Sequence, residues 1–374
     1  MRLAVAVVLS LAVASCRTQQ AVPPSPSSPA SATARPTAAA LPTSTVGTMS
    51  HAADGTVVVS IPDCLVTHVG AAISGCEVLQ AGADTDVFVA VLRWTDGYFE
   101  ARSVDLSSGE MRTLIAKEDL GIQLEDVRGD IALLLEIDNT GAGTAHARLL
   151  RVPWRDPTKV DTLDEIDLVG LGGGDTWNPW PAARTNGKDI AWLHAGGALG
   201  KHQLVLLDFA GRRHIVGETD RPIWFDLDYG GGVPVALFNA DGSSQRFFYY
   251  LAGTVHEMGM RDAANAGYVM SFGRYVGWTL GTGTVRPIDG IDLSTDTGKG
   301  IGTQRPEPGC TFVGRTYKDL VSVCPSGTRL KDVFANTIRD GPPSRVVLSF
   351  PRALLWRTTA DLAANPQVWR VTLV

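Results

Sequence analysis

The residues with the clearest potential for chemistry are the five cysteines. Four of them stand as two pairs that are close in sequence, Cys64 with Cys76 and Cys310 with Cys324. Loops of this size close readily, and each bridge would stabilise an exported domain by about 3 kcal/mol. We expect these two disulfides, with a bridge between the two ends of the domain as the alternative. Since no C-x-x-C occurs and no histidine lies at ligand spacing from these cysteines, we expect no metal site.

The fifth cysteine, Cys16, ends a segment that is typical of a signal peptide. Arg2 precedes the apolar run from Leu3 to Ala14, which is shorter than the roughly 20 residues of a membrane-spanning helix. The string V-A-S-C then resembles the bacterial lipobox, in which the cysteine is lipidated and becomes the new amino terminus. We expect residues 1–16 to form a lipoprotein signal segment that is cleaved directly before Cys16. The lipid on Cys16 would then hold the protein on the extracytoplasmic side of the cell membrane. The alternative is an ordinary secretory signal with an incidental cysteine.

A third group of candidates consists of acidic residues that stand directly before recurring apolar runs: Asp86, Asp130 and Asp189. Paired carboxylates of this kind could serve a glycan-directed hydrolase or lyase. Their more ordinary role is in turns that lead into strands. The motifs G-x-S-x-G and G-x-x-x-x-G-K-[ST] do not occur in the sequence, and we predict no catalytic residue and no cofactor.

A candidate binding segment lies between Val160 and Arg184, where about 15 residues exceed the spacing of the repeat described below. Insertions in repeats map to loops on one face, and this one combines glycines with two tryptophans and polar groups. Its candidate ligand-binding residues are Asp175, Trp177, Asn178 and Trp180. The alternative is that both tryptophans pack between repeats.

Composition divides the chain into a tether and a folded part. From Arg17 to Ser50, 25 of 34 residues are Ala, Pro, Ser or Thr and none is acidic, so we expect a disordered tether over residues 17–50. It would reach about 30 Å as a coil and about 100 Å when extended. Residues 51–374 carry 30 basic and 39 acidic side chains, a net charge of −9. This charge argues against a nucleic-acid partner.

The folded part contains a repeat. Six apolar runs start at intervals of 44, 59, 43, 42 and 45 residues, and each is followed by a polar turn and a further strand. The runs begin at Val87, Ile131, Ile190, Val233, Tyr275 and Leu320. Four strands in 40 to 50 residues are typical of propeller blades. A β-sandwich or solenoid with evenly spaced strands is the alternative.

The length of residues 51–374 corresponds to about seven blades, with six or eight also compatible. ALLWRTT from Ala353 is the seventh inner-strand candidate, and QVWRVTLV then ends the chain, so the last blade lacks strands. TVVVSI, from Thr56 to Ile61, could complete it by pairing the two ends of the domain. We predict an all-β propeller of about seven four-stranded blades.

One stretch carries a family resemblance. WPAARTNGKDIAWL, from Trp180 to Leu193, resembles the repeat of TolB-type propellers, in which a tryptophan and a proline lead into a D-G-K-x-I-A-F turn and strand. Weaker copies occur at Gly129–Leu133 and Gly273–Trp278. The resemblance implies a fold and no particular activity, because these residues serve turns and packing. We therefore expect a monomeric, non-enzymatic binding or scaffold module with an envelope protein or glycan as its partner.

Overall fold

The computed structural model describes residues 48–61, 76–94, 97–118, 120–141, 144–169, 182–194, 202–210, 212–219, 223–227, 232–238, 244–251, 253–257, 266–272, 275–280, 288–292, 299–300, 307–363 and 367–374. Strands dominate these residues, and the one helix found there is α1, Thr359–Ala363. This described part contains no helix that is long and apolar enough to cross a membrane. The predicted signal segment and Cys16 lie outside it, as does nearly all of the tether.

Six sheets each contain four antiparallel strands that follow one another along the chain. The first three are β3 (Cys76–Ala83), β4 (Val87–Trp94), β5 (Tyr98–Asp105), β6 (Met111–Glu118); β7 (Gly121–Arg128), β8 (Ile131–Gly141), β9 (Thr144–Pro153), β10 (Asp161–Val169); and β11 (Ala182–Thr185), β12 (Asp189–His194), β13 (His202–Asp208), β14 (Arg213–Thr219). The next three are β15 (Ile223–Phe225), β16 (Val233–Phe238), β17 (Ser244–Leu251), β18 (Thr254–Glu257); β19 (Ala266–Phe272), β20 (Tyr275–Leu280), β21 (Ile288–Asp292), β22 (Lys299–Gly300); and β23 (Thr311–Arg315), β24 (Asp319–Cys324), β25 (Gly327–Asp332), β26 (Thr337–Asp340).

A seventh sheet joins the two ends of the folded part and confirms the predicted closure. Its strand order is β1-β2-β29-β28-β27. The bounds are β1 Thr48–His51, β2 Val57–Ile61, β27 Val346–Ser349, β28 Ala353–Arg357 and β29 Gln367–Leu373. β2 pairs antiparallel with β29 from Val57 opposite Val371 to Ile61 opposite Gln367. Each end of the chain therefore supplies strands that the other needs.

This closing sheet corrects the prediction of seven four-stranded blades. Six blades have four strands, and the sheet that closes the ring has five because β1 adds an outermost strand beside β2. β1 begins at Thr48, so the propeller includes three residues that the sequence assigned to the tether. The tether composition hid this strand, since Thr48 and Ser50 are residue types that also suit a coil.

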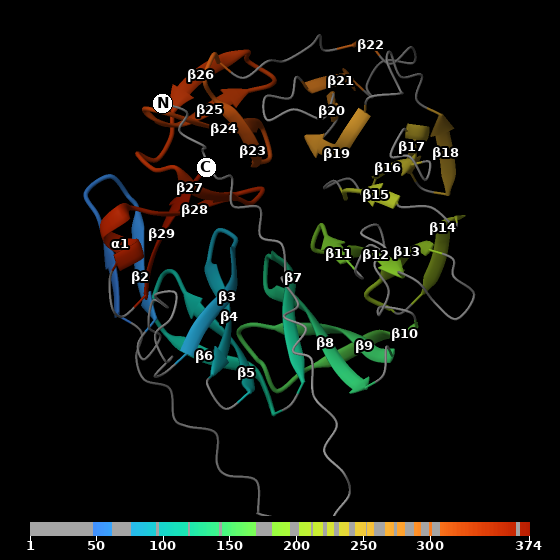
Figure 1. Cartoon of the computed structure of the whole chain (residues 1–374), viewed down its shortest axis with the longest axis horizontal. Coiled ribbons are helices and arrows are strands. Elements are labelled where there is room, and N and C mark those ends of the chain that lie inside the picture. Colours follow the sequence, from blue (N-terminus) through green and yellow to red (C-terminus); the bar gives the residue numbers. More distant parts are fainter. Residues whose placement is uncertain are drawn as a thin grey trace, which may run out of the picture. The chain divides into compact units, whose positions relative to one another are not determined.

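The sheets stand around a ring as the blades of a β-propeller, and the first strand of each blade lies nearest the middle (Figure 1). The six apolar runs of the repeat form the second strands β4, β8, β12, β16, β20 and β24. ALLWRTT forms β28, which is likewise the second strand, so the innermost strand of each blade is the segment before the run. Its inward edge has no partner strand, so continuous burial is not required there.

Second strands such as β4, β8 and β28 are continuously apolar because both of their faces are buried between blades. In β4, Val87, Val89 and Val91 belong to one cluster with Leu134 of the next blade. The alternate residues, such as Phe88, belong to another cluster with Leu355 of the closing blade. The hydrophobic core is thus divided into interfaces between neighbouring blades, and this division explains a repeat of apolar runs without polar alternation.

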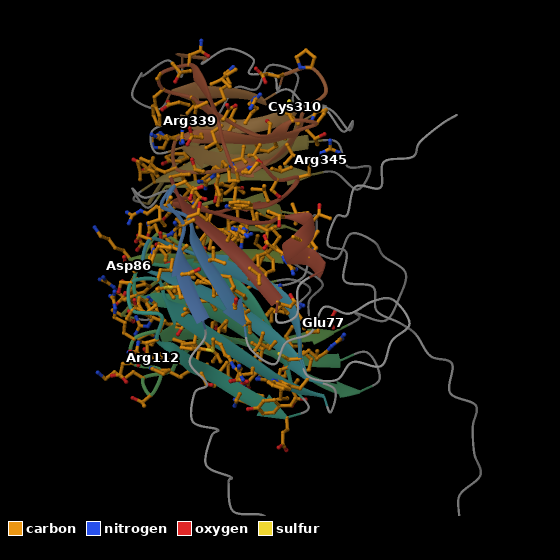
Figure 2. The ribbon with its side chains drawn as sticks, turned by 90° about the vertical axis from the view of Figure 1, so that its left-hand side faces the viewer. Glu77, Asp86, Arg112, Cys310, Arg339 and Arg345 are labelled. Carbon is orange, nitrogen blue, oxygen red and sulfur yellow. A yellow bond between two sulfur atoms is a disulfide. The ribbon has the colours of Figure 1, made fainter. Side chains whose placement is uncertain are left out.

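The two faces of the ring differ in their connections. Turns between the first and second strands and between the third and fourth strands lie on one face, marked by Asp86 and Arg112 at the left in Figure 2. The strand ends that lead from each blade to the next lie on the opposite face, marked by Glu77 and Cys310. We call these the turn face and the connection face. Strand β10 ends and β11 begins on the connection face.

Candidate functional site

The innermost strands around the propeller axis are the natural place for a site, and they carry a recurring aspartate. Asp84, Asp126 and Asp226 each stand near the end of an innermost strand. In each, Oδ1 accepts a hydrogen bond from the backbone N–H of the next residue, at 2.9 Å in all three cases. This local bond fixes the carboxylate and directs Oδ2 towards another blade.

The second oxygen of each aspartate links different blades. Asp84 Oδ2 accepts from the backbone N–H of Gly129 at 2.8 Å, and Asp126 Oδ2 accepts from that of Thr185 at 2.9 Å. Asp226 instead pairs with Arg315, whose Nε donates at 3.0 Å. Asp226 and Arg315 belong to blades that have the β19–β22 blade between them. These carboxylates therefore hold the ring together from the inside.

Glu125 is the innermost-strand acid with the most altered environment. The pairing of β7 with β8 is interrupted by a bulge between Leu124 and Asp126, and Glu125 is the extra residue. Its Oε2 accepts from the backbone N–H of Ala183 at 3.0 Å, and Arg184 Nη1 donates to its backbone oxygen at 3.0 Å.

Burial raises the pKa of Glu125 above its usual range, and the neighbouring Asp126 carboxylate acts in the same direction. Arg184 and the hydrogen bond from Ala183 act in the opposite direction without outweighing burial. A carboxyl group of this kind can hold a proton at a pH where an exposed glutamate is ionised. Sequence reasoning missed Glu125. The available signal was the Glu-Asp pair within GIQLEDVR, directly before the turn that leads into β8.

The acids that the sequence selected are turn residues. Asp86, Asp130 and Asp189 all stand where the first strand of a blade turns into the second, so the repeat placed them correctly as equivalents. The Asp86 side chain is 58% exposed and lies 3.4 Å from Arg155. The backbone N–H of Asp189 donates to Asn186 Oδ1 at 2.8 Å, which closes the turn around Gly187, where φ is +91°. These contacts account for the residues as turn formers on the turn face.

One of the two predicted disulfides is confirmed. Cys310 and Cys324 form a disulfide between the start of β23 and the end of β24. Cys76 is also disulfide-bonded, and its partner lies outside the described residues, as does Cys64. Glu307 lies within 4.8 Å of the Cys310 and Cys324 sulfurs, but sulfurs that are bonded to each other are not thiolate ligands. While the disulfide is intact, Glu307, Cys310 and Cys324 therefore cannot bind a metal ion together through thiolates.

The four candidate ligand-binding residues, Asp175, Trp177, Asn178 and Trp180, lie outside the described residues. Part of the extra length that drew attention to them forms regular structure, because β8, β9 and β10 span 11, 10 and 9 residues. Residues 182–193, the described part of the segment that resembles the TolB-type repeat, form β11, a turn and most of β12. This agrees with the order of turn and strand that the repeat implies.

Neither family models nor curated proteins match the sequence. Solved structures do match the fold. An oligogalacturonate lyase from Vibrio parahaemolyticus has 9% identity, 87% coverage of this chain, 96% coverage of its own and a TM-score of 0.54. A prolyl endopeptidase has 11% identity and a TM-score of 0.52, and the match covers 75% of this chain but only 46% of the endopeptidase. TolB from Acinetobacter baumannii has 12% identity, 77% coverage of this chain, 63% of its own and a TM-score of 0.39.

At these identities the comparisons establish the class of protein and nothing narrower. The chain is a β-propeller, as the lyase and endopeptidase matches and the seven sheets agree. The functions of these proteins differ from one another, as expected for a fold that hosts many activities.

Proposed function

We propose that the chain is an exported, lipid-anchored propeller of TolB-like type that acts as a non-enzymatic binding or scaffold module at the cell envelope. The observation that carries this proposal is the use of the axial acids Asp84, Asp126 and Asp226. Their oxygens accept hydrogen bonds from the backbone or from an arginine of another blade. General acid–base catalysis instead requires carboxyl groups that can reach a substrate. Rigid blades that are joined in this way suit a platform for a partner.

The connection face is the proposed binding face. β10 ends and β11 begins on that face, and the sequence between them, which contains Trp177 and Trp180, is the longest departure from the repeat. Tryptophans beside polar groups suit contact with a glycan or a protein loop. A lipid on Cys16 and the tether would hold a monomeric propeller near the membrane, within reach of an envelope partner.

Replacement of Trp177 and Trp180 by alanine is expected to abolish binding of the purified propeller to isolated cell envelopes, because both anchoring side chains are lost. The matched control replaces Tyr317 and Phe334, two 43%-exposed aromatic residues in turns of the turn face. The bound fraction is measured by sedimentation, and the melting temperature confirms that each variant folds. Equal binding by both double variants would contradict the proposal.

A second function, a glycan-directed hydrolase or lyase, is favoured only by the raised pKa of Glu125. The oligogalacturonate lyase match supports it no further, since that likeness is one of fold. In this case Glu125 would be the proton donor or acceptor, and Arg184 would orient an acidic sugar.

The variant Glu125→Gln tests this second function. Glutamine keeps an acceptor for the Ala183 N–H and cannot ionise. Because the folded pKa of Glu125 is raised, its contribution to stability is full below the unfolded pKa, about 4.3, and is lost as pH rises through the folded value. We expect the variant and the wild type to be equally stable at about pH 4, and we expect the variant to be more stable than the wild type at about pH 7. Turnover of an acidic oligosaccharide by wild type and not by the variant would establish the enzyme.

A further inference from the structure

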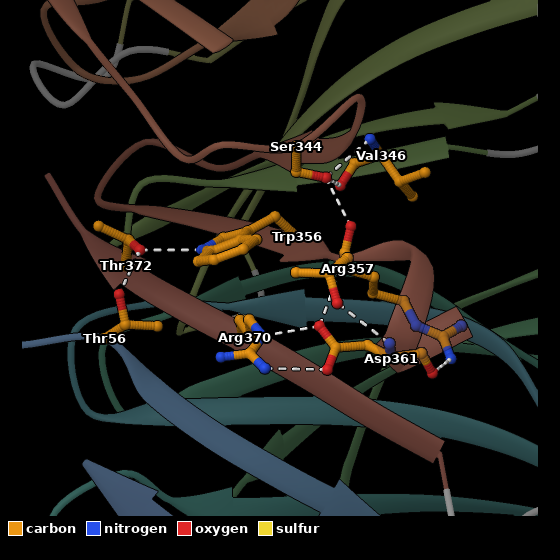
Figure 3. A network of polar contacts seen from close by, with 9 residues as sticks. Thr56, Ser344, Val346, Trp356, Arg357, Asp361, Arg370 and Thr372 are labelled. Carbon is orange, nitrogen blue, oxygen red and sulfur yellow. Dashed lines mark hydrogen bonds and ion pairs between the residues drawn. The ribbon is translucent and has the colours of Figure 1, made fainter. Parts of the chain in front are cut away.

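Arg357 is a buried cation in the closing blade, and one of its donors lacks an acceptor among the described residues. It ends β28, and the residue as a whole is 8% exposed. Its Nη2 donates to the backbone oxygen of Asp361 at 2.9 Å (Figure 3). Its Nε is buried and meets no hydrogen-bond acceptor among the described residues. A buried guanidinium normally has its donors satisfied and its charge paired.

The nearest carboxylate is already used by a second arginine. Arg370 of β29 donates to both oxygens of Asp361, at 2.6 and 3.0 Å, and the backbone N–H of Thr358 donates to the same carboxylate at 2.8 Å. Burial alone would raise the pKa of Asp361, but these bonds outweigh it and the pKa lies below the usual value. Asp361 is therefore an anion that neutralises one arginine. The exposed Asp54 also interacts with Arg370, and among the described residues neither carboxylate accepts a hydrogen bond from Arg357.

A second buried donor lies beside Arg357. The guanidinium carbon is 5.0 Å from the centroid of the Trp369 ring, so the two side chains stack between β28 and β29. Trp369 is 9% exposed, and its Nε1 also meets no acceptor among the described residues. Both unpartnered atoms are donors, so only an acceptor can satisfy them.

Arg357 and Trp369 lie at the interface between the closing blade and the first blade, and this limits the size of the acceptor. Ala353 and Leu355 alternate with Trp356 along β28 and belong to the cluster that faces the first blade, and Arg357 continues their side of the strand. Trp369 contacts Phe88 of the first blade, with ring centroids 6.3 Å apart. Because both residues are about nine-tenths buried at this interface, a glycan or a peptide cannot reach the two donors, and the acceptor must be small.

From this arrangement we propose that Arg357 and Trp369 form a binding site for a small monovalent anion such as chloride. The ion places a negative charge beside Arg357 and accepts from the unpartnered N–H groups. Its position on the closing blade, at the interface with the first blade, makes the stability of the closed propeller depend on anion concentration.

The site is tested with chloride itself. The melting temperature of the wild type is expected to rise with the logarithm of chloride concentration over about a hundredfold range, at constant ionic strength maintained with a larger anion. Arg357→Met should lose this dependence, and Trp369→Phe, which keeps the stacking but removes the N–H, should weaken it. Arg345→Met is the matched control. Arg345 is an exposed arginine directly before β27 of the closing blade, and it donates to the Pro325 backbone oxygen.

A crystallographic measurement keeps the proposal falsifiable if a variant fails to fold. Crystals of the wild type grown in bromide should show an anomalous peak beside Arg357 Nε. The absence of a peak there, or the same chloride response in wild type and Arg357→Met, would overturn the site.

Discussion

Removal of residues 1–61 is expected to prevent the propeller from folding, whereas removal of residues 1–47 is expected to leave its melting temperature unchanged. The longer deletion takes away β1 and β2, and with β2 the partner of β29 along five residue pairs. It also removes Val57, Val59 and Ile61, which are 4%, 0% and 2% exposed in the cluster between the closing and first blades.

The expected size of this effect follows from burial. Each of these side chains contributes about 1.5 to 3 kcal/mol, so their sum of roughly 5 to 9 kcal/mol is comparable to the whole stability of a typical domain. The deletion would also leave β29 as an unpaired edge that promotes aggregation. Circular dichroism melts and size-exclusion chromatography measure both consequences. Deletion of residues 1–51, which removes only β1, is the control and should cause a small loss. A stable monomer after the 1–61 deletion would show that β2 is not needed for closure.

Much of this architecture could be predicted from sequence because it depends on local patterns. Second strands such as β4 and β8 are buried on both faces, so their sequences are continuously apolar and their spacing reveals the blade repeat. Closure by Thr56–Ile61 followed from the incomplete last blade. β1 could not be predicted, since it becomes a strand only by pairing with β2 and nothing in its own composition indicates this.

The candidate site was harder to predict because its contacts are distant in sequence. Asp84 reaches Gly129 across 45 residues, and Asp126 reaches Thr185 across 59. Arg357 and Trp369 look like ordinary strand residues until strand pairing places them together. The acids chosen by their position before apolar runs were turn residues. Aspartate is common in turns because its side chain accepts hydrogen bonds from the nearby backbone, so this position does not distinguish a turn residue from a catalytic one.

The second large effect concerns Cys16. Cys16→Ala is expected to move the protein from the membrane fraction to the soluble exported fraction, because the acyl chains that we propose for this residue would be lost. Each buried methylene contributes about 0.8 kcal/mol to membrane binding. Arg17→Ala, which leaves Cys16 in place, is the control. Fractionation with a detergent phase separation gives the distribution, and mass spectrometry of the wild type should find a lipidated Cys16 as the first residue. Membrane association that is the same in both variants would exclude the anchor.

The proposed binding face is tested most directly by photo-crosslinking in intact cell envelopes. Crosslinking residues are introduced singly at Glu77 and Arg345 on the connection face and at Asp86 and Arg112 on the turn face, all four of them visible in Figure 2. Binding through the connection face predicts partner adducts from Glu77 or Arg345 and none from the other two positions. Adducts confined to Asp86 and Arg112, or adducts from neither face, would contradict it.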